Sequence, residues 1–169
     1  MQLKNKKVAV IGMGRTGIAT ANFLIANQAL VTLVDSRPRK ELEKSLCSLH
    51  PDILTLFDSL EPPLSSDVIV LSPGVDIHSK FLDKARKQGT EIISEIELAS
   101  RFTKIPIIAV TGTNGKSTVT TLIGEILKRS GKKVAVGGNL GAPFIDLLSQ
   151  KTVDYFVLEI STFQLEGIK

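Results

Sequence analysis

Cysteine, histidine and aromatic side chains are scarce in this chain of 169 residues, and each scarcity excludes a class of protein. Cys47 is the only cysteine, so the chain contains no internal disulfide. The two histidines, His50 and His78, lack partners at metal-ligand spacing and are interpreted as surface residues. Tryptophan is absent, aromatic residues make up 5%, and the basic residues are dispersed. The net charge of +4 therefore indicates small phosphate-bearing ligands rather than nucleic acid.

Long apolar runs are also missing. No stretch approaches the length that spans a membrane, and the first residues lack the apolar segment of a signal peptide. We therefore expect a cytoplasmic protein without membrane contacts. With 43% hydrophobic and 22% charged residues, the chain has the composition of a globular protein that buries a core.

Short apolar runs alternate with amphipathic segments throughout, a pattern typical of a parallel α/β fold. Expected strands cover Lys7–Ile11, Val31–Asp35, Ile53–Phe57, Val68–Ser72, Glu91–Ile93, Ile107–Thr111, Val134–Val136 and Tyr155–Ile160. Expected helices cover Gly17–Asn27, Arg39–Leu49, Lys80–Gln88, Ile96–Phe102, Ser117–Ser130 and Pro143–Leu148, with Gly89 and Gly131 as carboxyl-terminal caps.

A glycine-rich turn, Gly12-Met-Gly-Arg-Thr-Gly17, joins the first expected strand to the first expected helix. Asp35 ends the next strand and completes a dinucleotide-binding fingerprint: a tight turn, a diphosphate at a helix amino terminus, and a carboxylate for ribose hydroxyls. Both NAD and a UDP-sugar carry the nucleoside diphosphate that this fingerprint specifies. A glycine-rich turn without a ligand is the alternative interpretation.

Two further segments belong to the same sheet edge. Ser72-Pro-Gly-Val75 follows the fourth strand, and open α/β sheets bind ligands where the carboxyl ends of strands meet. Gly74 lets a flat ring lie against the backbone. Asp35, Ser36 and Arg37 offer groups that can read a uracil or ribose edge, although Arg37 is equally consistent with a solvated loop residue.

A second glycine loop, Thr111-Gly-Thr-Asn-Gly-Lys-Ser-Thr118, lies between an apolar strand and an amphipathic helix. Its first glycine, Gly112, stands three positions before Gly115 instead of five, so the loop is a tighter variant of the P-loop. Lys116 would reach the β- and γ-phosphates and Ser117 would offer its hydroxyl to Mg²⁺. The loop predicts binding of ATP or GTP; a plain Gly/Asn turn with a solvated lysine is the alternative.

The strand–loop–helix pattern restarts near residues 94–106. We therefore expect an α/β fold with two domains. Residues 1–94 would form a Rossmann-like parallel-sheet domain that binds the UDP substrate, and residues 95–169 the start of a P-loop ATP-binding α/β domain.

Three motifs in the second half resemble the Mur ligases of peptidoglycan synthesis: Ala109–Glu125, Val136-Gly-Gly-Asn-Leu-Gly141, and Leu158-Glu-Ile-Ser-Thr-Phe-Gln-Leu-Glu166. Together with the first glycine turn, Asp35-Ser-Arg37 and Ser72-Pro-Gly74, the set is most similar to the family member that adds D-glutamate. The resemblance covers the entire chain.

The resemblance implies a role for each matching position. The UDP-linked substrate would be bound by Gly14, Arg15, Thr16, Asp35, Ser36, Arg37, Gly74 and Asn139. ATP would be bound by Gly112, Thr113, Asn114, Gly115, Lys116, Ser117 and Thr118. Lys116 and Glu159 would be catalytic, and Ser117 and Glu159 would hold Mg²⁺. An exposed or ion-paired glutamate at a strand end is the alternative interpretation of Glu159.

The implied reaction is ATP-dependent amide formation between UDP-N-acetylmuramoyl-L-alanine and D-glutamate through an acyl phosphate, in a full-length enzyme expected to be a monomer. The family has three domains, and the chain stops at Lys169, so we expect no ligation by this chain alone. Residues 105–169 should be marginally stable or prone to association, whereas residues 1–94 could fold alone.

Other classes of protein remain open. An NAD-dependent oxidoreductase or NAD-sensing module explains the first glycine loop but gives Lys116 and Glu159 no purpose. A P-loop kinase or GTPase explains the second loop but not Asp35, Ser72 and Gly74. A non-catalytic UDP-binding remnant is the third alternative.

Overall fold

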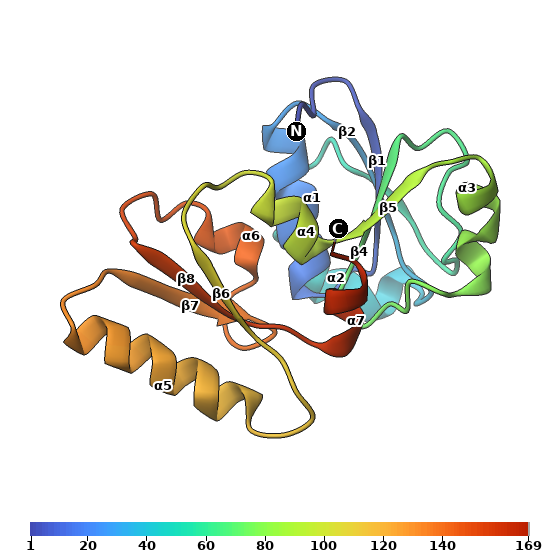
Figure 1. The fold of residues 1–169 in the computed structure, drawn as a ribbon. Helices are drawn as coiled ribbons and strands as arrows, with labels where there is room; N and C mark the ends of the chain where they lie inside the picture. The colour runs from blue at the N-terminus through green and yellow to red at the C-terminus, as the bar shows by residue number, and fades with distance from the viewer. Residues whose placement is uncertain (169) are drawn as a thin grey trace.

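The computed structural model describes residues 1–168 and contains two parallel sheets (Figure 1). The first sheet has the strand order β3-β2-β1-β4-β5 and the second has the order β6-β8-β7. Their strands are β1 (Lys7–Ile11), β2 (Leu30–Val34), β3 (Leu54–Leu56), β4 (Val68–Leu71), β5 (Glu91–Ser94), β6 (Ile107–Val110), β7 (Val134–Gly138) and β8 (Tyr155–Glu159). The expected parallel α/β fold is therefore confirmed. We call the parts built on the first and second sheets the first and second units.

Helices connect the strands and cover the sheets. They are α1 (Arg15–Ala26), α2 (Arg39–Leu46), the short 3₁₀ helix η1 (Lys80–Leu82), α3 (Asp83–Lys87), α4 (Glu95–Ser100), α5 (Lys116–Arg129), α6 (Phe144–Leu147) and α7 (Thr162–Glu166). Within residues 1–168, no helix is both long enough and apolar enough to cross a membrane.

Successive side chains along a strand point to opposite faces of the sheet, so alternate residues of the first sheet pack into two different cores. Ala9 and Ile11 belong to a core completed by η1 and α3, whereas Val8 and Val10 face the opposite side. This second core continues through α1, α4 and α6 into the second sheet, where Phe144 and Phe156 meet edge to face with ring centroids 5.1 Å apart. One hydrophobic core therefore joins the two units.

The second sheet lies between α5 on one side and α6 on the other, and α6 packs in turn against α1 and α4 (Figure 1). On the outer side of α5, the apolar residues Val119, Leu122 and Ile126 are 45%, 56% and 57% exposed. The second unit therefore presents an apolar helix face that no described residue covers.

The structure contains all eight expected strands, with ends that differ by at most two residues. Gly89 and Gly131 follow α3 and α5 with φ of +74° and +82°, which supports the predicted glycine caps. The helix expected from Lys80 begins instead with a 3₁₀ turn, a common start for a helix.

Helix α7 was not among the expected helices. A capping box forms it: the Ser161 hydroxyl accepts a hydrogen bond from the Gln164 amide, and the Gln164 side chain accepts one from the Ser161 amide. The Ser-x-x-Gln spacing was the available sequence signal.

Candidate functional site

The first glycine loop is fixed to its surroundings. Gly12 has φ of +100°, which favours glycine, and a Cβ at Gly17 would overlap the Gly12 carbonyl. The Ser72 hydroxyl, at the end of β4, donates a 3.2 Å hydrogen bond to the same carbonyl. Since β1 and β4 are neighbours at the point where the strand order reverses, the loop lies where this fold binds ligands.

Asp35, just after β2, is buried and fully hydrogen-bonded. Its Oδ2 accepts from the Met13 amide at 2.6 Å and from Arg37 Nη2 at 2.9 Å, while its Oδ1 accepts from the Arg37 amide and Nε, both at 2.9 Å. Burial raises the pKa of Asp35, but these hydrogen bonds outweigh it and lower the pKa to about 2. With four hydrogen bonds accepted, the carboxylate has no lone pair left for a ligand hydroxyl.

A pocket of about 470 Å³ lies between the first glycine loop and residues 138–143 of the second unit. Arg15 Nη1 spans it and donates a 2.8 Å hydrogen bond to the Gly141 carbonyl. Five of the predicted UDP-substrate residues line this pocket, whereas Asp35, Ser36 and Arg37 do not. The lining residues are Gly14, Arg15, Thr16, Gly17, Ser72, Pro73, Gly74, Gly138, Asn139, Gly141 and Pro143.

The second glycine loop, residues 111–115, is exposed. Gly112 and Gly115 have φ of +146° and +75°, values that favour glycine, and α5 begins directly afterwards. The Lys116 ammonium folds back over the loop and donates to the carbonyls of Gly112 at 2.8 Å and Thr113 at 3.4 Å. The predicted phosphate-binding cation therefore already lies over the loop.

Glu159, the last residue of β8, is 4% exposed and lies between the start of α5 and Asn139. Its Oε2 accepts a 2.6 Å hydrogen bond from the Ser117 hydroxyl, and its Oε1 accepts a 3.0 Å hydrogen bond from Nδ2 of the Asn139 side chain. The structure thus brings the two predicted metal ligands into direct contact. Hydroxyl and carboxylate oxygens are the donors that Mg²⁺ prefers, so these residues fit that ion.

A second buried carboxylate, Glu95, was not singled out from the sequence. It is 1% exposed at the start of α4, and its Oε1 accepts a 2.7 Å hydrogen bond from the Ile145 amide of α6. Its Oε2 has no partner within residues 1–168. Burial, aided by the nearby Asp146 carboxylate, raises the pKa of Glu95 to about 7 despite the hydrogen bond from Ile145.

Two parallel sheets, each with a glycine loop at the carboxyl end of its first strand, define a tandem α/β protein with a Rossmann-like and a P-loop-like unit. Comparison with known families refines this class. Residues 6–94 match the family described as Mur ligase MurD-like, N-terminal domain, and residues 110–168 match the Mur ligase middle domain. The chain belongs to the Mur ligase family.

Two curated relatives carry the name UDP-N-acetylmuramoylalanine--D-glutamate ligase. The protein from Geobacter sp. (strain M21) is 46% identical over 173 residues, which cover 100% of this chain and 38% of that protein. The protein from Caldicellulosiruptor saccharolyticus is 46% identical over 175 residues, which cover 100% of this chain and 39% of that protein. The chain therefore spans less than half the length of these relatives.

Among solved structures, the chain is similar to the UDP-N-acetylmuramate:L-alanyl-gamma-D-glutamyl-meso-diaminopimelate ligase from Neisseria meningitides. The match has a TM-score of 0.51 and 17% identity, and covers 94% of this chain and 55% of the other. At this identity the similarity concerns the fold alone.

Proposed function

We propose that this chain forms part of an ATP-dependent amide ligase that joins D-glutamate to UDP-N-acetylmuramoyl-L-alanine in peptidoglycan precursor synthesis. One observation carries the proposal: a buried carboxylate links the pocket to the second glycine loop. Asn139 lines the pocket and donates to Glu159, which accepts from Ser117 at the start of α5. The relatives that share 46% identity have the corresponding name.

Asp35 does not offer the contact that the dinucleotide fingerprint assigns to it. The dinucleotide fingerprint needs a carboxylate that accepts the ribose hydroxyls. Asp35 instead receives hydrogen bonds from Met13 and Arg37. We therefore assign it the task of fixing the first glycine loop and orienting Arg37, whose side chain is 47% exposed and can face a ligand.

In the proposed reaction, the alanyl carboxylate attacks the γ-phosphorus of ATP, and ADP leaves. The D-glutamate amine then attacks the acyl phosphate carbonyl, forming the amide bond and releasing phosphate and a proton. Lys116 would leave its loop carbonyls to contact the β- and γ-phosphates, and the pocket would hold the carboxylate in line. Ser117 and Glu159 would hold Mg²⁺, which would offset the charge of the transferred phosphoryl group.

The first experiment is calorimetric titration of the chain with UDP-N-acetylmuramoyl-L-alanine and, separately, with NAD. We expect binding of the UDP-linked substrate, at least about 10-fold weaker in Arg15→Ala because a charge-assisted phosphate contact is lost. Lys151→Ala, which removes an exposed cation outside the pocket, is the matched control. Tighter binding of NAD than of the UDP-linked substrate would overturn the proposal.

We also propose that the division near residue 94 separates two domains, in a cytoplasmic enzyme that acts as a monomer. The change of sheet supports this division, and so do the two family matches. We expect the second unit to exchange its amide hydrogens faster than the first. Because one core joins the units, unfolding of the second unit should nevertheless be coupled to unfolding of the first. Equal protection of both units in hydrogen exchange would contradict this expectation.

A further inference from the structure

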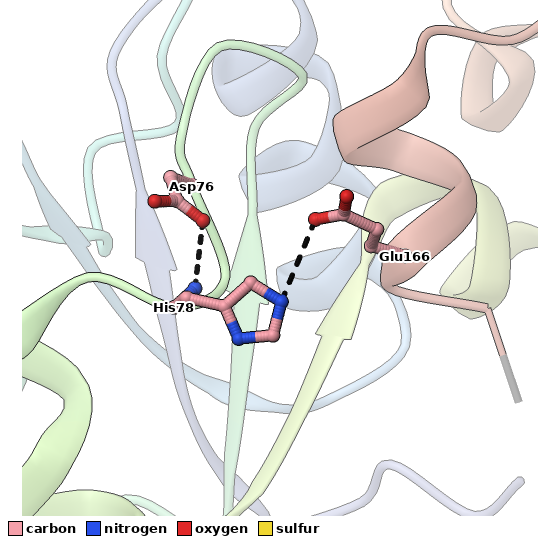
Figure 2. A group of neighbouring side chains, drawn as sticks. All are labelled: Asp76, His78 and Glu166. Carbon is pink, nitrogen blue, oxygen red and sulfur yellow. Dashed lines mark hydrogen bonds and ion pairs between the residues drawn. The ribbon is translucent and has the colours of Figure 1, made fainter.

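Three side chains of metal-binding type lie together outside the pocket (Figure 2). Asp76 and His78 belong to the segment between β4 and η1 of the first unit, and Glu166 is the last residue of α7 in the second. Their ligand atoms all lie within 4.8 Å of one another, and all three residues are exposed. His78 looks isolated in the sequence because its neighbour Glu166 is distant along the chain.

The spacing of these atoms suits a shared cation. His78 Nε2 and Glu166 Oε2 are 3.6 Å apart, beyond normal hydrogen-bond length. In a tetrahedral zinc site, with Zn–N of about 2.0 Å and Zn–O of about 2.1 Å, two such ligand atoms lie roughly 3.4 Å apart. Asp76 Oδ1 accepts a 2.8 Å hydrogen bond from the His78 amide, which leaves Oδ2 available for coordination.

The local charge also favours a cation. Asp76 and Glu166 bring two carboxylates together, and within residues 1–168 neither forms an ion pair with lysine or arginine. The nearby Arg86 guanidinium instead contacts Asp83 and the Ile77 carbonyl. A divalent ion would replace the repulsion between the two carboxylates with attraction to both.

We propose that Asp76, His78 and Glu166 bind a divalent transition metal, with Zn²⁺ as the fitting ion, and that this metal joins the two units. An imidazole with two carboxylates suits zinc, and water would complete the coordination from the exposed side. The bridge would extend an existing contact, because the neighbouring Gly167 carbonyl accepts a 3.2 Å hydrogen bond from the Ser94 amide. The metal would fix α7 against the segment that follows the Ser72–Gly74 turn of the pocket.

Zinc titration in competition with a chromophoric chelator tests the proposal. We expect one Zn²⁺ per chain, with affinity lowered at least about 10-fold in His78→Ala and in Glu166→Gln, since each loses a direct ligand. His50→Ala is the matched control: His50 also lies near a carboxylate, with its Nδ1 3.9 Å from Asp52 Oδ2, but belongs to no group of three such ligands within residues 1–168. Circular dichroism checks that each variant is folded.

If His78→Ala bound zinc as tightly as the wild type, or if His50→Ala lost as much zinc affinity as His78→Ala, the proposed site would be wrong. Displacement of Zn²⁺ by millimolar Mg²⁺ would also overturn it, because imidazole is a poor ligand for magnesium and the metal would then belong with Ser117 and Glu159. Hydrogen exchange tests the bridge: Zn²⁺ should slow exchange in residues 76–79 and in α7 of the wild type, but not of Glu166→Gln. Zinc binding without slower exchange in α7 would contradict a bridge between the units.

Discussion

The two glycine loops of this chain differ in how firmly the fold holds them. In the first, Gly17 packs against the Gly12 carbonyl, and Asp35 and Ser72 bond to the loop from neighbouring strands. In the second, residues 111–115 are exposed, and Lys116 bonds only to carbonyls of its own loop. Contacts with neighbouring strands therefore fix the first loop, whereas the second is bonded by Lys116 within the loop itself.

The surroundings of the loops explain this difference. The first lies at the centre of a five-stranded sheet with a core on each face. The second follows an edge strand of a three-stranded sheet, and β6 contains no fully buried residue. Changes that break the contacts holding the first loop, such as Gly17→Ala, should therefore lower stability, whereas Lys116→Ala in the second should mainly lower ligand affinity.

The contact between α4 and α6 offers the largest expected effect on stability. The pKa of Glu95 is about 7 in the folded chain, against an ordinary value of 4.5, so its contribution to stability is full below pH 4.5 and is lost as the pH rises to about 7. The loss should be about 3 kcal/mol at 1.36 kcal/mol per pH unit. Glu95→Gln keeps the acceptor for Ile145 and should lack this pH dependence.

Urea unfolding at several pH values between 4.5 and 7.5 measures this effect, with the difference between wild type and Glu95→Gln as the readout. Parallel pH profiles for the two proteins would show that Glu95 does not titrate at the contact between α4 and α6.

A substitution that disturbs the packing of the first loop should cause the next largest loss of stability. The Cβ of Gly17→Ala would overlap a backbone carbonyl that cannot move without shifting β1, so we expect a loss of roughly 2 to 3 kcal/mol. Gly14→Ala is the control, because its Cβ would meet no atom within 4 Å. Chemical denaturation compares the two variants. Equal losses would contradict the idea that packing fixes this loop.

Removal of the Asp35 charge, which helps to hold the first loop, should lower the free energy of unfolding by a slightly smaller amount. The pKa of Asp35 is lowered from 3.8 to about 2, so its stabilising contribution is full above pH 3.8 and is lost as the pH falls to about 2. Asp35→Asn should cost roughly 2 kcal/mol at pH 7 and little at pH 2. Asp52→Asn, which changes an exposed carboxylate, serves as control. If the difference in unfolding free energy between wild type and Asp35→Asn stayed constant from pH 2 to pH 7, the charge of Asp35 would not explain it.

The second loop should show the smallest effect on stability. Lys116→Ala should change the unfolding free energy by less than about 0.5 kcal/mol, because the residue bonds only within an exposed loop. The same change should weaken binding of Mg²⁺-ATP at least about 10-fold, measured by calorimetry, whereas Lys132→Ala should not. A marked loss of stability in Lys116→Ala would remove the contrast between the loops.

Local features of the sequence predicted the eight strands and both glycine loops. Most strands are short runs dominated by apolar residues, and each loop contains glycine at positive φ. Contacts between residues far apart in the sequence could not be predicted in this way. Arg15 bonds to a carbonyl 126 positions away, and Glu95 finds Ile145 across 50 positions. Such pairs depend on how distant elements of the fold pack together, which no local pattern records.

The alignment of three strand ends has a further consequence. Val110, Glu159 and Gly138 are register partners across the second sheet, so the loop after β6, the carboxylate and Asn139 lie on one line. Side chains alternate along a strand, so deleting one residue within β8 would turn Glu159 to the opposite face. At positions other than Glu159, Gly137 and Gly138, the site should thus tolerate changes of residue type in these strands better than changes in their length. Insertions and deletions should therefore fall outside β6, β7 and β8.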